Sequence, residues 1–200
     1  MTWLQPVTLR GTRVTLAPLD MNHHDGLVEA VKDGELWQLW YTSVPAPENM
    51  GKEIERRLRL QANGEMLPFT VITNPDNKAA GMTTYMNVDA PNRRVEIGST
   101  WYRKSVQRTG LNSECKLLLL QHAFETLDCI AVEFRTHFFN RQSRTAIERL
   151  GAKLDGILRS HQLAANGTLR DTCVYSIVAA EWPAVKANLT WHLARAFRDS

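Results

Sequence analysis

The sequence predicts an α/β (α+β) fold in which a mixed, mostly antiparallel sheet carries several helices. Three β-rich segments joined by short Asn, Asp and Pro turns follow one another between residues 69 and 102, which is typical of an antiparallel meander. A long apolar helix then stands between two strands, a pattern that favours a parallel pair. With 200 residues and 44% apolar composition, the chain can bury one sizeable core, so we expect residues 1–200 to form a single domain.

The first half of the chain alternates between strands and helices. Residues 13–19 alternate weakly between apolar and polar types and predict a first strand, and helices are expected at residues 23–32 and 48–63. Between these helices lies an aromatic segment that precedes a proline-broken stretch. Its aromatic residues are Trp37, Trp40 and Tyr41.

The meander occupies the middle of the chain. Its strands are expected at residues 69–73, 79–88 and 93–102. The helix over residues 111–127 presents a broad apolar face, and residues 130–137 form the next strand. Strand, helix and strand in this order predict a parallel pair with a right-handed crossover.

The last part of the chain predicts a helix, a hairpin and a terminal helix. The helix over residues 141–150 ends at Gly151, a residue suited to a left-handed cap. Residues 156–161 and 170–178 form a hairpin with its turn near Asn166-Gly167. After Pro183, an apolar residue recurs every four positions: Val185, Leu189, Leu193 and Phe197. This stripe either packs on its own domain or contacts a second copy, and we expect a homodimer.

Composition excludes several functional classes. The formal charge is +3 and no dense Lys/Arg block occurs, so nucleic acid is not expected as a partner. No apolar run reaches the ~20 residues that span a bilayer, and residues 1–20 lack the order of a signal peptide. We therefore expect a cytoplasmic protein without a membrane partner. The three cysteines are far apart and form no CxxC motif, which predicts neither a disulfide nor a metal site.

The most informative segment is a basic loop that leads from the strand at residues 93–102 into the helix at residue 111. It contains Arg103, Lys104, Arg108 and Gly110. The first amides of a helix have no intrahelical partner, and the helix dipole is positive at this end. Together with the three cations, they predict a site for a phosphate or a pyrophosphate.

In this context, the segment Gln107-Arg108-Thr109-Gly110-Leu111-Asn112 resembles the acyl-CoA pyrophosphate loop of the GNAT N-acetyltransferases, Q/R-x-x-G-x-G/A. The match holds at Gln107 and Gly110 and departs at Asn112, where the family has Gly or Ala. Asparagine tolerates left-handed and capping conformations, so the loop can still close.

Further motifs resemble the RimJ/RimL-like branch of that family, in the same order along the chain. They are Val95-Glu96-Ile97-Gly98, Asn140-Arg141-Gln142-Ser143, Leu150-Gly151-Ala152, and the closing strand at residues 170–176 with Glu181-Trp182-Pro183. The resemblance covers residues 9–183. It implies a twisted central sheet with helices on both faces, and acetyl transfer from acetyl-CoA to a primary amine of a small molecule, an amino acid or a protein N-terminus.

The resemblance implies a base that takes a proton from the acceptor amine. Glu96 is our candidate, because burial in an apolar strand would raise its pKa toward a useful range. The structural alternative is a strand glutamate that reaches solvent. Asp171 is a weaker candidate, and it could equally fix a strand end.

Ser143 is the candidate group near the leaving thiol. Many family members carry a tyrosine seven residues after the asparagine, but here that position is Ile147, which favours Ser143. Asn140 and Arg144 would contact the cofactor. The structural alternatives are a serine or an asparagine that caps its helix, and a solvated arginine.

The complete predicted cofactor site combines three segments: the end of the strand at residues 93–102, the basic loop with the first residues of the helix that follows it, and the start of the helix at residues 141–150. Its residues are Thr100, Trp101, Tyr102, Gln107, Arg108, Thr109, Gly110, Leu111, Asn112, Asn140, Ser143 and Arg144. The aromatic side chains of Trp37, Trp40 and Tyr41 would hold the acceptor by cation–π contact, or else belong to the core.

Two other functions compete with acetyl transfer. The chain could be a catalytically weak acyl-CoA-binding module, an alternative that Asn112 and the missing tyrosine leave open. A nucleotide-binding enzyme fits poorly, because neither G-x-x-x-x-G-K-[ST] nor G-x-G-x-x-G occurs.

Overall fold

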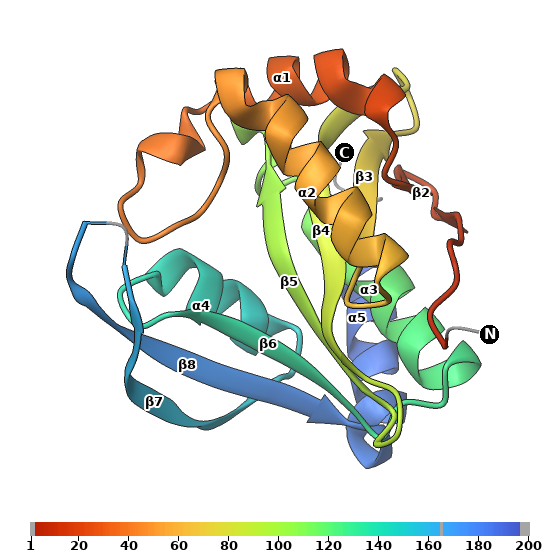
Figure 1. The fold of residues 1–200 in the computed structure, drawn as a ribbon. Coiled ribbons are helices and arrows are strands. Elements are labelled where there is room, and N and C mark those ends of the chain that lie inside the picture. The colour runs from red at the N-terminus through yellow and green to blue at the C-terminus, as the bar shows by residue number, and fades with distance from the viewer. Residues whose placement is uncertain (1–2, 165, 197–200) are drawn as a thin grey trace.

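The structure, a computed structural model, describes residues 3–164 and 166–196, and Figure 1 shows one twisted sheet with helices on both faces. The strands follow the order β1-β2-β3-β4-β5-β6-β8-β7. They are β1 (Leu9–Arg10), β2 (Val14–Pro18), β3 (Leu67–Thr73), β4 (Lys78–Asp89), β5 (Arg94–Tyr102), β6 (Ala131–His137), β7 (Lys153–Leu163) and β8 (Leu169–Val178).

In the described part of the chain, five α-helices and several short helical turns lie between or after the strands. The α-helices are α1 (His24–Lys32), α2 (Met50–Ala62), α3 (Leu111–Gln121), α4 (Arg141–Arg149) and α5 (Trp182–Ala196). The turns are η1 (Met21–His23), η2 (Leu36–Gln38), η3 (Pro47–Asn49), η4 (Lys104–Val106), η5 (His122–Thr126) and η6 (Ala179–Glu181). Among the described helices, we find none that is long and apolar enough to cross a bilayer.

The predicted meander and parallel pair are confirmed. β3, β4 and β5 form the antiparallel meander, β2 pairs antiparallel to β3, and β5 pairs with β6 in parallel across α3. β7 and β8 form the predicted hairpin. The two-residue strand β1 was not predicted, because so short a segment carries no periodicity of its own.

The helix predicted over residues 111–127 has nearly the predicted extent but changes its type before its end. α3 stops at Gln121 and continues as a π-helical turn, η5. The hydroxyl of Tyr85 donates to the carbonyl of Leu119 at 2.5 Å, so a side chain from β4 competes for a carbonyl of the helical ladder. An inserted side chain is a common cause of such a local change in helical pitch.

Two apolar clusters cover the two faces of the sheet. α1 and α2 contribute Leu27 and Ile54 to the smaller cluster. The larger cluster joins the other face to α3, α4 and α5, through residues such as Leu119, Ile147 and Leu189. The prediction of helices on both faces is therefore confirmed.

The apolar stripe of the C-terminal helix is used within the chain. Val185, Leu189 and Leu193 are buried, and α5 packs against α3. Phe197 lies outside the described residues. Of the two alternatives for this stripe, packing on its own domain is therefore the one observed.

Glu114 should be important for stability, because it holds the connection between β1 and β2. Its buried carboxylate accepts the amides of Thr12 at 2.7 Å and Arg13 at 2.9 Å. In Glu114→Gln one of the two acceptors becomes a donor, so we expect a loss of about 2 kcal/mol in the free energy of unfolding.

Urea unfolding measures this change. The control is Glu55→Gln, a substitution of an exposed carboxylate on α2, which should leave the midpoint unchanged. Equal midpoints for both variants would contradict the role given to Glu114.

Candidate functional site

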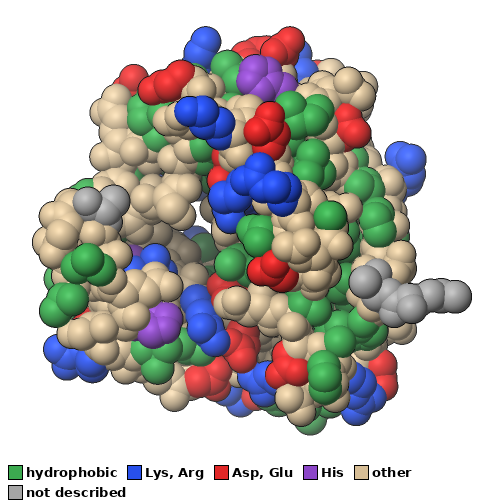
Figure 2. Space-filling view, viewed as in Figure 1, with side chains coloured by type: hydrophobic (Ala, Val, Ile, Leu, Met, Phe, Trp, Pro, Cys, Tyr) green, Lys and Arg blue, Asp and Glu red, His purple; other side chains and the backbone are tan. Residues whose placement is uncertain are grey.

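A cleft opens where β5 and β6 separate. The two strands pair only at Arg94, Val95 and Glu96 of β5, opposite Ala131, Val132 and Glu133 of β6. Beyond Glu96, β5 continues beside β4 alone, and Figure 1 shows the two strands diverging as a V. Figure 2 shows a hollow between the part that carries α4, β6, β7 and β8 and the rest of the molecule.

A β-bulge at Ser99 shapes the β5 side of this cleft. Ser99 has a left-handed φ of 47°, and the pairing with β4 shifts between Met82/Trp101 and Thr84/Gly98. The bulge reverses the alternation of side chains, so Ile97 and Tyr102 both join the larger core cluster although they are five residues apart. Trp101 belongs to the cluster on the opposite face.

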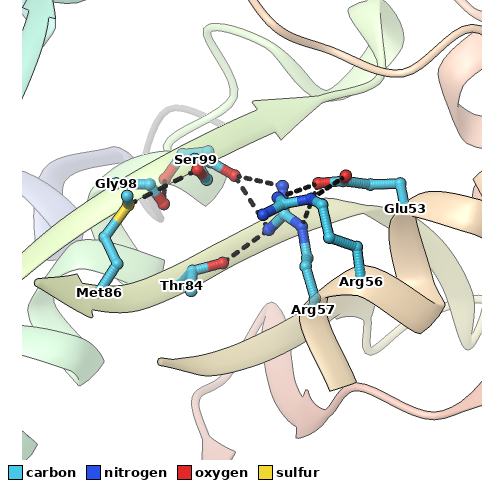
Figure 3. A network of polar contacts seen from close by, with 8 residues as sticks. Glu53, Arg56, Arg57, Thr84, Met86, Gly98 and Ser99 are labelled. Carbon is cyan, nitrogen blue, oxygen red and sulfur yellow. Dashed lines mark hydrogen bonds and ion pairs between the residues drawn. The ribbon is translucent and has the colours of Figure 1, made fainter. Parts of the chain in front are cut away.

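Arg57 of α2 holds the bulge from one face of the sheet. Its side chain is 2% exposed, and its Nη1 donates to Thr84 Oγ1 at 2.6 Å and to the Ser99 carbonyl at 3.4 Å. Glu53 pairs with Arg57 at 2.7 Å, and this partner compensates a buried charge. Figure 3 shows the guanidinium between the carboxylate and the bulge.

Lys116 of α3 holds the same bulge from the other face. Its Nζ donates to Thr100 Oγ1 at 2.9 Å and to Thr83 Oγ1 at 3.3 Å. Burial lowers the pKa of this lysine to about 8. The side chain of Thr100 is thus bound within the protein, and only its backbone remains for the predicted cofactor contact.

Glu96 lies at the vertex of the V. Its side chain is buried, with 5% of the residue exposed, and burial raises the pKa of the carboxyl above its ordinary value. Three neighbours oppose this shift: Asn87 Nδ2 donates to Glu96 Oε2 at 2.6 Å, Arg135 Nε lies 3.6 Å away, and the charge of Arg170 also favours the carboxylate. Glu96 therefore does not reach bulk solvent, and its environment suits a base.

The basic loop exposes a row of backbone donors. Arg108 and Gly110 both adopt left-handed φ angles, 65° and 84°. From Arg108 to Ser113, no backbone amide donates to another group in the part of the chain that the structure describes. A run of unpaired amides at a helix N-terminus is an anion-binding arrangement, so the predicted phosphate site has the expected local geometry.

The charges around this loop differ from the prediction in two respects. Arg103 pairs with Asp33 at 3.2 Å, so this cation fixes the loop to α1. Arg13 donates from Nη1 to the Thr109 carbonyl at 2.7 Å and thus brings an additional cation to the loop. Sequence reasoning missed Arg13, because 96 residues separate it from Thr109.

The start of α4 lies next to the loop. Gln142 donates from Nε2 to Gln107 Oε1 at 3.3 Å, and this bond joins the two predicted cofactor segments. Asn140 accepts the amide of Ser143 at 3.0 Å and is the helix N-cap. The half-buried Ser143 has no hydrogen bond from its hydroxyl to any described residue.

Arg144 is half-buried at the start of α4. Its Nε donates to the Tyr175 hydroxyl at 3.0 Å, and its guanidinium lies 5.0 Å from the ring centre of Phe138. The cofactor contact predicted for Arg144 stays a prediction. The nearby Asp171 accepts from Arg159 Nε at 2.6 Å and from the Ser160 amide at 2.7 Å, and the amide bond contributes most to its lowered pKa. The alternative in which Asp171 fixes a strand end therefore agrees with its contacts.

The three predicted aromatic residues separate into two environments. Trp37 packs on the apolar cluster beneath α1 and α2. Trp40, which is 52% exposed, lies at the cleft with its ring centre 5.0 Å from that of His137. Tyr41 and Phe139 complete the aromatic group. Sequence reasoning missed His137 as a neighbour of Trp40, because only the fold brings the end of β6 to this loop.

Comparison with known proteins agrees with this geometry. A family model described as an acetyltransferase (GNAT) domain matches residues 13–153. YdaF of Bacillus subtilis (strain 168), a candidate ribosomal N-acetyltransferase, is 32% identical over 111 residues, which are 56% of this chain and 60% of that relative's length.

Solved structures share the fold over nearly the whole chain. A candidate acetyltransferase from T. thermophilus is 30% identical with a TM-score of 0.82, and the match covers 96% of this chain and 99% of that one. Mycobacterium smegmatis RimJ, solved in complex with CoA-disulfide, has a TM-score of 0.78 over 94% of this chain and 95% of its own. Its identity is 21%, so this likeness concerns the fold alone.

The bond between Asn87 and Glu96 should control the titration of that carboxyl. In Asn87→Ala the carboxylate loses a donor, so we expect the already raised pKa of Glu96 to rise further. Carboxyl NMR of the folded protein measures this value. Asn92→Ala removes an exposed asparagine that bonds Asp89 in the same hairpin and should leave Glu96 unchanged. A lower pKa in Asn87→Ala would contradict the assignment.

Proposed function

The chain belongs to the GNAT acetyltransferase family, and on that premise we propose that it transfers the acetyl group of acetyl-CoA to the α-amine of a protein N-terminus. In this proposal the backbone amides of the loop at residues 108–113 bind the diphosphate of CoA, and the pantetheine arm lies along the free edge of β5. Glu96 takes the proton of the attacking amine.

One observation carries the proposal: Glu96 is the last paired residue before β5 and β6 separate. A group held in the V between these strands ends beside this buried carboxylate. An α-amine has a pKa of about 8 and is mostly protonated at neutral pH, whereas only the free base attacks a thioester. A carboxylate with a raised pKa can accept that proton.

The cysteines support direct attack by the amine rather than an acyl-enzyme intermediate. Cys115, Cys129 and Cys173 are all buried and free. Burial raises the pKa of Cys115 and of Cys129 to about 12, and it raises that of Cys173 as well. Since the thiolate is the reactive form, none of the three is an effective nucleophile at neutral pH.

In the proposed reaction the C–N bond forms as the C–S bond breaks. The amine loses a proton to Glu96, and the thiolate of CoA must gain one or meet a positive charge. We propose that the hydroxyl of Ser143, which is uncommitted among the described residues and lies beside the loop contact between Gln142 and Gln107, donates a hydrogen bond to the leaving thiolate. The thiolate then takes the second proton that the newly acylated nitrogen releases. The name of the Bacillus subtilis relative supports a protein acceptor.

Glu96→Gln tests the base. The amide cannot accept the proton, so we expect kcat to fall by about 10²-fold or more near neutral pH. The rate should recover partly at high pH, where the amine is already deprotonated. In the unaltered protein, activity should increase as the pH is raised from acid values and Glu96 ionises. The midpoint of this increase should lie above the ordinary pKa of glutamate.

Release of free CoA thiol from acetyl-CoA and an N-terminal peptide measures these rates. The matched control is Glu133→Gln, which lies opposite Glu96 in register. The negative charge of Glu133 raises the pKa of Glu96. The Glu133→Gln variant should therefore keep its kcat, and the rise of its activity with pH should begin at a lower pH. An unchanged profile in Glu96→Gln would remove Glu96 from the base role.

Gly110→Ala tests the loop. Gly110 has a φ of 84°, and an alanine there costs about 1–2 kcal/mol in that conformation or changes it. We expect the Kd for CoA to rise about tenfold, as measured by calorimetry. Gly167→Ala carries the same kind of strain at a φ of 81° in the β7–β8 turn and should bind CoA normally. Normal binding in both variants would place the diphosphate elsewhere.

A further inference from the structure

β6 and β8 carry a row of polar side chains on the same side of the sheet as Glu96. Glu96 lies opposite Glu133 in register, and Arg135 and His137 lie opposite Val174 and Thr172. Directly opposed residues point to the same face, and alternation along each strand adds Arg170 to this row. The reverse face, with Phe134 and Tyr175, belongs to the core.

Arg170 on this face lacks an acidic partner. It is half-buried, and its Nε donates to Thr172 Oγ1 at 3.2 Å. Within the described chain no carboxylate forms an ion pair with it, whereas Arg135 pairs with Glu133 at 3.0 Å. Burial lowers the pKa of Arg170, and the nearby charge of Glu96 opposes that shift. A partly desolvated guanidinium without a carboxylate is unfavourable and is available to a ligand.

His137 presents a second unused donor next to Arg170. Its Nδ1 accepts the amide of Phe139 at 3.1 Å, so the other nitrogen, Nε2, carries the hydrogen of the neutral ring. The residue is 3% exposed, and Nε2 has no hydrogen-bond partner among the described residues. The ring of Trp40 lies against this histidine, and a change of rotamer at Trp40 would open access to Nε2.

We propose that Arg170, assisted by His137, binds a carboxylate of the acceptor and so selects acceptors that carry a negative charge close to the reacting amine. This inference rests on the proposed acetyl transfer. A guanidinium binds a carboxylate through two parallel hydrogen bonds, which would orient the amine toward Glu96. Glu96 does not satisfy Arg170 itself, because Asn87 and Arg135 already contact its carboxylate.

Two kinds of acceptor present this chemistry. One is a protein N-terminus with an acidic first or second residue, and the other is a free amino acid with its α-carboxylate. Three pairs of acceptors, whose members differ only in charge, distinguish these two origins of the carboxylate. The pairs are a peptide that begins with Asp or with Asn, a peptide that begins with Glu or with Gln, and a free amino acid or its amide.

The experiment measures kcat/KM for each pair with the full chain and acetyl-CoA, by release of CoA thiol. In the unaltered protein we expect the charged member to be preferred by about tenfold or more, the range for a charge-assisted hydrogen bond. Arg170→Gln should abolish this preference, chiefly through a higher KM for the charged member. Arg170→Lys should retain part of it.

Arg159→Gln is the matched control, because this arginine belongs to the same hairpin but already pairs with Asp171. It should retain the preference. A preference confined to the peptide pairs would identify an acidic N-terminus, and one confined to the amino acid pair would identify a free amino acid; both outcomes support the carboxylate site.

Equal rates on the charged and uncharged members would overturn the inference but leave acetyl transfer in place. Retention of the full preference in Arg170→Gln would likewise overturn the role of this residue. Failure to release thiol with any of the six acceptors would instead overturn the proposed function, and the inference with it.

Discussion

The early separation of β5 from β6 is the constraint on which the site depends. The strands share only the pairs from Arg94 to Glu96, and the bulge at Ser99 then turns β5 away. Two buried cations hold this bulge from opposite faces, Arg57 at the Ser99 carbonyl and Lys116 at the Thr100 hydroxyl. Because charges this deep are costly without partners, both side chains oppose any rearrangement that would let β5 rejoin β6 and close the cleft.

This constraint divides the site between two faces of the sheet. The loop with its unpaired amides and the first turn of α4 lie on the side of the larger core, where Gln107 meets Gln142. Glu96, Arg135 and His137 lie on the other side, below the loop that carries Trp40. The two sides meet at the vertex of the V, where the buried carboxylate of Glu96 lies.

Most of the fold could be predicted from local sequence patterns. The meander, the parallel crossover and the β7–β8 hairpin are confirmed because periodicity and turn residues are read from neighbours in the chain. The change from α-helical to π-helical geometry after Gln121 was not predicted, since the Tyr85 hydroxyl that competes for the Leu119 carbonyl comes from a strand 34 residues away. The sequence also could not predict whether the apolar stripe of α5 packs on its own domain or on a second copy, because its burial depends on which distant element covers it.

The sequence by itself determined most of the elements, the basic loop before α3 and the candidacy of Glu96, because each depends on residue type and spacing within one segment. Only the tertiary structure decided the surroundings of these residues. It gave Glu96 its neighbours Asn87 and Arg135, turned Arg144 toward Tyr175, and left Arg170 without an acidic partner. The physical reason is that charge pairing and desolvation act through space, between residues whose separation along the chain carries no signal.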